Sequence, residues 1–62
     1  MNETILGPGG RVKALLREDA AYIKILTPGG TVLGQYDKSN DITTTAGGKF
    51  IGYGNQLFTL ID

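Results

Sequence analysis

Basic and aromatic side chains over residues 11–24 form the pattern with the clearest chemical content. A strand turns alternate side chains to opposite faces. A strand over residues 11–17, paired with the next one, would therefore gather five such residues on one face: Arg11, Lys13, Arg17, Tyr22 and Lys24. Cations beside a stacking ring are the groups that single-stranded nucleic-acid binders use. The same stripe also fits a solvated face or a guarded sheet edge, where basic side chains discourage aggregation.

Carboxylates are the other residues that could do chemistry. Without histidine or cysteine, catalytic triads of the Ser-His-Asp type, thiol chemistry and thiolate metal sites are excluded. Glu18 and Asp19 form one pair, and Asp37 with Asp41 forms another. With Asn40, the second pair offers oxygens to a hard cation, but the spacing differs from that of a calcium loop. Because aspartate favours hairpin corners, we expect turns here and predict no enzyme, no cofactor and no metal.

Glycine-rich segments such as "GPGG" and "PGG" resemble phosphate-binding loops only superficially. A phosphate loop is followed by a helix whose amides point at the anion, whereas strand-like residues follow these glycines. Glycine reaches positive φ without steric cost, which tight hairpin turns require. We therefore predict turns at these positions.

The glycine pairs recur within an internal repeat. They stand at residues 9–10, 29–30 and 47–48, in the pattern [PA]-G-G-x-[VF]-x-[AG]. The spacings of 20 and 18 residues suit a hairpin with its connection. The last position of the pattern carries a small residue, which predicts a bend, a bulge or a close approach of another strand at Ala14, Gly34 and Gly52.

The repeat predicts an all-β fold. The expected strands span residues 3–6, 11–17, 21–27, 31–36, 41–45, 49–53 and 57–61. We expect three successive Gly-Gly-turn hairpins in a small barrel or a strongly bent antiparallel sheet, closed by the strand 57–61 against the first hairpin. One alternative stays open, because residues 11–20 are also rich in helix-forming residues at helical spacing.

Several expected strands carry apolar residues on both faces. Val32 and Tyr36 are expected on one face with Gly34, and Leu33 on the other. A small barrel has one interior, so a second apolar face indicates a contact with another chain. The interface candidates are Leu26, Leu33, Ile51, Tyr53, Phe58 and Leu60.

Length and charge limit the function. The 62 residues suit a single small domain, 1–62, whose marginal core favours oligomerisation. Six basic and six acidic residues balance, and no segment has the features of a signal peptide or a membrane span. We expect a soluble, cytoplasmic, non-enzymatic interaction or assembly module. Its partner would be a second copy, most simply in a dimer, or another protein, with no membrane contact. The alternative is a small nucleic-acid-binding β-barrel.

Overall fold

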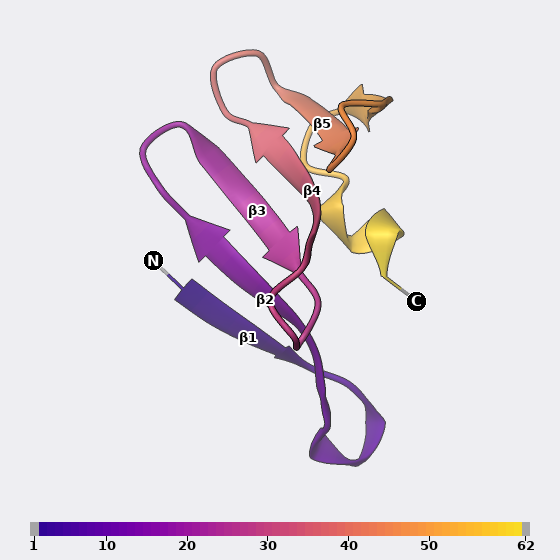
Figure 1. Cartoon of the computed structure of the whole chain (residues 1–62). Helices are drawn as coiled ribbons and strands as arrows, with labels where there is room; N and C mark the ends of the chain where they lie inside the picture. Colours follow the sequence, from indigo (N-terminus) through magenta and orange to yellow (C-terminus); the bar gives the residue numbers. More distant parts are fainter. Residues whose placement is uncertain (1, 62) are drawn as a thin grey trace.

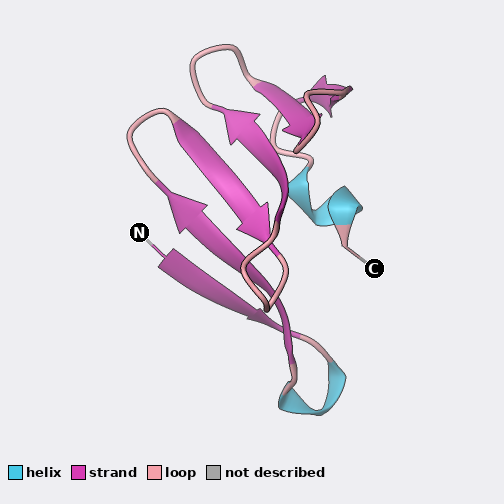
Figure 2. Ribbon diagram, viewed as in Figure 1, coloured by secondary structure: helices cyan, strands magenta, loops and turns pink. Residues whose placement is uncertain are grey.

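The computed structural model describes residues 2–61, which form one antiparallel sheet of six strands. The strands follow one another across the sheet in chain order (Figure 1). They are β1 (Asn2–Leu6), β2 (Val12–Glu18), β3 (Tyr22–Leu26), β4 (Val32–Asp37), β5 (Ile42–Thr45) and β6 (Phe50–Tyr53). Residues 2–61 contain no α-helix, only two short 3-10 segments, η1 (Pro8–Gly10) and η2 (Leu57–Leu60) (Figure 2).

Three turns with the same backbone hydrogen bonds join β1 to β2, β3 to β4 and β5 to β6. In each, the residue two places before the glycine pair donates its amide to the carbonyl four residues later. The bonds measure 2.7 Å for Gly7 to Arg11, 2.8 Å for Thr27 to Thr31 and 2.8 Å for Thr45 to Lys49. The second glycine of each pair has a positive φ of 78°, 96° or 90°, a conformation that side chains oppose.

Each of these strand pairs shifts register once, shortly after its turn. The extra residue, which has no partner in the register, is Lys13, Leu33 or Ile51. The residue after it is the small one of the repeat, and it lies opposite Ile5, Ile25 or Thr43. Ala14, Gly34 and Gly52 therefore occupy one structural position three times.

The register shift corrects the expected faces of β4. Val32 lies opposite Leu26, whereas Gly34 lies opposite Ile25. Since Leu26 and Ile25 are consecutive, their side chains point to opposite faces. Val32 is therefore not on the face of Gly34, and Leu33 packs against the core instead of lying opposite Gly34 and Tyr36. A bulge changes the alternation that the sequence pattern assumes.

The core lies on one face of the sheet, beneath η2. Ala14, Ile25 and Leu57 are its buried centre, at 0%, 0% and 1% exposure. Seven partly buried side chains surround them: Ile5, Leu16, Ile23, Leu33, Tyr36, Leu60 and Ile61. Figure 1 shows η2 folded back beside the sheet. This face is the buried side of a two-layer structure. No segment among residues 2–61 covers the other face, called the open face below, although Leu26 is buried there.

Two expectations about closure are wrong. The sheet is open, since the register runs from β1 to β6 without a pairing between these two strands in residues 2–61. The segment 57–61 is not a closing strand, because Leu57–Leu60 forms η2 and buries Leu57. Gly54, at a φ of 76°, donates its amide to the Asp41 carbonyl at 2.8 Å and diverts the chain after Tyr53.

Residues 11–20, for which the sequence allowed either a strand or a helix, contain a strand. Val12–Glu18 is β2, paired with β1 on one side and with β3 on the other. Its alternation buries Ala14 and places Leu16 against the core. The hydrogen bonds of β2 to β1 and β3, together with the burial of its apolar side chains, outweigh helix propensity. That propensity contributes less than about 1 kcal/mol per residue.

Candidate functional site

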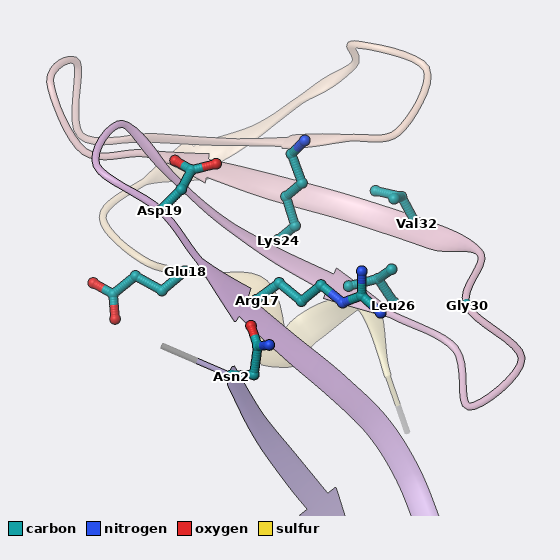
Figure 3. Close-up of a pocket in the computed structure, with 8 residues that line it drawn as sticks. All are labelled: Asn2, Arg17, Glu18, Asp19, Lys24, Leu26, Gly30 and Val32. Carbon is teal, nitrogen blue, oxygen red and sulfur yellow. The ribbon is translucent and has the colours of Figure 1, made fainter.

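A pocket of about 550 Å³ lies on the open face of the sheet, opposite η2. Figure 3 shows the side chains that surround it. They come from β1, the β2–β3 hairpin and the turn before β4: Asn2, Arg17, Glu18, Asp19, Lys24, Leu26, Gly30 and Val32. The pocket thus combines an apolar part, made by Leu26 and Val32, with charged groups.

Two cations lie directly opposite each other in this pocket. Arg17 of β2 pairs in register with Lys24 of β3, and Asn2 of β1 lies on the other side of Arg17. Figure 3 shows the Arg17 side chain extending toward Leu26. Because β2 and β3 are paired on both sides, neither cation guards a sheet edge.

The two carboxylates of the pocket are engaged by other groups. Glu18 forms an ion pair with Lys38 at 2.7 Å, and the hydrogen bond and charge of Lys38 lower the pKa of that carboxyl. Asp19 Oδ1 accepts the backbone amides of Tyr22 at 2.8 Å and Ala21 at 2.9 Å. These two hydrogen bonds lower the pKa of Asp19. Asp19 therefore stabilises the turn between β2 and β3, whereas Glu18 links the end of β2 to Lys38, which follows β4.

The structure brings together only part of the expected basic stripe. Tyr22 alternates onto the same face as Lys24, and lies opposite Asp37. Lys13 is the extra residue of the first bulge, so it leaves the row of Arg17. Arg11 lies in the first turn. Of the expected stripe, Arg17 and Lys24 lie next to each other, and Tyr22 lies on the same face of β3, two residues before Lys24.

The carboxylates of the acidic loop after β4 are engaged in hydrogen bonds with residues of that loop and of β4. Asp37 accepts bonds from the Ser39 amide at 2.9 Å and the Asn40 side-chain amide at 2.8 Å. The Asn40 bond is the largest cause that lowers the pKa of Asp37. Tyr36 donates its hydroxyl to Asp41 Oδ1 at 2.6 Å, which raises the pKa of Tyr36. Within residues 2–61, no three carboxylates gather as a metal-binding group would.

The six apolar candidates divide between the protein's own packing and its surface. Leu26 is buried, Ile51 is half-buried, and Leu33 and Leu60 pack against the core. Tyr53 and Phe58 are 71% and 57% exposed. Three further exposed apolar residues, which the sequence pattern did not predict as interface residues, lie next to the glycine turns: Leu6, Val12 and Phe50. Their place beside a turn was the available signal.

The outer edge of β1 carries unpaired backbone groups. The Gly7 amide points toward β2, where it reaches the Arg11 carbonyl. In an antiparallel strand, successive residues direct their amide and carbonyl to alternate sides. The backbone groups of Asn2, Thr4 and Leu6 therefore point away from β2, and no strand among residues 2–61 pairs with them.

The opposite edge of the sheet is poorly suited to pairing. β6 has four residues, contains the bulge at Ile51 and ends before the turn at Gly54. Short length and bulges are the devices that discourage edge pairing in natural sheets. β1 has five residues, with Glu3 as its only charged side chain and neither lysine nor proline.

No helix within residues 2–61 is long and apolar enough to cross a bilayer. No protein-family model, curated protein or solved structure matches this chain.

Proposed function

We propose that the protein is a self-assembly module that pairs through the edge of β1 with a second copy of itself. The observation that carries this proposal is the β1 edge, which no strand among residues 2–61 pairs with or covers. An exposed strand edge is a template for pairing with another chain. The most common symmetry for such pairing is a two-fold dimer, in which the same strand contributes from both copies.

Backbone geometry supports one register. The outward groups belong to Asn2, Thr4 and Leu6, so Thr4 at the two-fold axis gives the longest overlap. Thr4 then bonds to Thr4 of the second copy, and Asn2 to its Leu6. Two open six-stranded sheets become one sheet of twelve strands.

Side chains are compatible with this register. Glu3 lies opposite Ile5 of the second copy, so the two carboxylates do not oppose each other. Leu6, which is 61% exposed, gains cover from the strand of the second copy. Covering exposed apolar surface stabilises association by about 25 cal/mol per Å². The pairing thus adds apolar burial to its backbone hydrogen bonds.

Antiparallel pairing between hairpins also occurs within the protein itself, where the second strand of one unit joins the first strand of the next. β2 joins β3 and β4 joins β5 in equivalent registers, with Leu16 opposite Ile25 and Tyr36 opposite Thr43. These residues occupy corresponding positions of the repeat. Antiparallel pairing between units is therefore the way this chain already extends its sheet.

A single substitution tests the proposed edge. Thr4→Pro removes an amide that points away from β2, so the monomer retains its own ladder. We expect sedimentation velocity at high salt to show a dimer for the wild type and a monomer for this variant. Thr4→Val keeps the amide and is expected to remain dimeric.

The contradicting results are equally distinct. A wild type that stays monomeric at high micromolar concentration would exclude self-assembly. A dimer that persists in Thr4→Pro but dissociates in Tyr53→Ser would place the interface at the β6 end. Circular dichroism of each variant checks that the sheet is intact.

A further inference from the structure

We infer that the open face binds a phosphate group between Arg17 and Lys24. The two cations of this site take no part in the proposed dimer, because their side chains project from the face of interior strands; Asn2 alone belongs both to the pocket and to the β1 edge. Of the five residues of the expected basic stripe, the register brings Arg17 and Lys24 directly opposite each other.

The first support is the pairing of like charges on interior strands. Directly opposed residues of an antiparallel pair have Cβ atoms about 4.5–5.5 Å apart, and like charges there destabilise the sheet. Arg17 and Lys24 are opposed in this way. Neither cation protects an edge, since β2 and β3 have neighbours on both sides. A bound anion would relieve the repulsion between them.

The second support is that the nearby acids form no ion pair with these cations, so the charge of Asp19 acts on Lys24 without occupying its donors. Glu18 is held by Lys38, and Asp19 Oδ1 by two backbone amides. Within residues 2–61, Arg17 and Lys24 form no ion pair and no side-chain hydrogen bond. The pocket thus keeps two cations whose donors are available to a ligand.

The third support is the match to phosphate chemistry. A phosphate monoester carries about −1.5 to −2 charge at neutral pH and several strong acceptor oxygens. Arginine offers a planar fork of donors and lysine a compact charge with three donors. Asn2 beside Arg17 and Gln35 beside Lys24 place amides on either side. Leu26 and Val32 form an apolar wall to one side of the cations.

A titration with inorganic phosphate tests the site. At constant ionic strength set with chloride, ¹H–¹⁵N spectra are expected to show saturable shifts concentrated at Arg17 and Lys24. Lys24→Glu should abolish these shifts. The same change replaces opposed like charges with opposite ones, so this variant is expected to melt at a higher temperature than the wild type.

Lys49→Glu is the matched control, since it makes the same charge change in the third turn. It should retain the phosphate shifts. Equal loss in both variants, or shifts in the wild type that do not saturate, would overturn the inference. A Lys24→Glu variant that is stable but still binds phosphate would also overturn it.

A second arm distinguishes the source of the phosphate group. Inorganic phosphate is compared with a short oligothymidylate. If phosphate displaces the oligonucleotide from Arg17 and Lys24, the site is supported, and a nucleic-acid backbone can supply the bound phosphate group. If phosphate binds and the oligonucleotide does not, the site is supported, and its ligand is a small phosphate compound. Oligonucleotide binding that leaves Arg17 and Lys24 unshifted would contradict it.

Discussion

Gly34→Ala tests whether the small residue of the repeat is required by packing. A Cβ built at Gly34 would overlap Leu60 Cδ1 and lie 2.6 Å from the Thr44 carbonyl oxygen. Leu60 belongs to η2, and Thr44 to the neighbouring strand β5. The side chain can rotate away, but the carbonyl belongs to the sheet backbone. Relief of this overlap therefore requires η2 or β5 to move.

The cost follows from these contacts. Overpacking of a core costs about 1–3 kcal/mol. Replacement of glycine by alanine returns about 0.4–1 kcal/mol through the unfolded chain. The net expectation is a loss of roughly 1–2 kcal/mol in the free energy of unfolding, and each kcal/mol lowers Tm by about 4–8 °C in a domain of this size. Denaturant titration and thermal melting measure both quantities.

Gly52→Ala is the matched control at the equivalent position of the repeat. Its Cβ would meet only Gln56 Cγ at 3.5 Å, an ordinary contact. We expect a change within about 0.5 kcal/mol, as for substitutions that disturb no packing. Equal losses in both variants would refute the packing explanation, because backbone flexibility alone would then account for the glycines. An unchanged Gly34→Ala would refute the close approach of η2.

Three further substitutions examine buried and turn hydrogen bonds. Thr43 is fully buried, donates to the Gly54 carbonyl at 2.7 Å and accepts the Gln56 amide at 2.9 Å. Thr43→Val should lower the free energy of unfolding by about 1–3 kcal/mol, as measured by urea titration. An equal loss in the less buried Thr44→Val would contradict a special role of the buried Thr43 hydroxyl. The lowered pKa values of Glu18, Asp19 and Asp37 give stability that is present above their ordinary values of 4.5, 3.8 and 3.8 and is lost as pH falls below them. Asp19→Asn should weaken this dependence of Tm on pH in the acid range, and an unchanged acid profile would contradict the role of the Asp19 turn. The raised pKa of Tyr36 gives stability that is present below its ordinary value of 10.0 and lost as pH rises through the folded-state value. Tyr36→Phe should reduce the alkaline loss, and a variant with the wild-type alkaline profile would contradict the Tyr36–Asp41 bond.

The repeat made the strands and the recurring small residue predictable. Glycine pairs between runs of β-branched and aromatic residues indicate turns and strands through local preferences. These preferences can be recognised in the sequence without knowledge of tertiary contacts. Ala14, Gly34 and Gly52 do share one register position. The sequence left the expected strand over residues 11–17 open to a helical alternative, because helix propensity and the repeat disagreed. The pairing of β2 with β1 and β3 decided between them.

The errors come from features that depend on packing. The bulges move Lys13 out of the basic row and Leu33 onto the core side, and alternation alone cannot reveal an extra residue. "LFTLI" has strand composition, but Leu57 is buried when the segment folds as η2. The expected closure failed because Gly54 redirects the chain. The pocket was only partly predictable, since Asn2 joins it through the register of β1.

Amide hydrogen exchange at β1 tests the proposed assembly most directly. The amides of Thr4 and Leu6 point away from β2, so they exchange rapidly in a monomer and are protected when two β1 edges pair. We predict that their protection rises with protein concentration, while that of the Ile5 amide, which points toward β2, changes much less. Rapid exchange of Thr4 and Leu6 at every concentration, including those at which the protein sediments as a dimer, would contradict pairing through this edge.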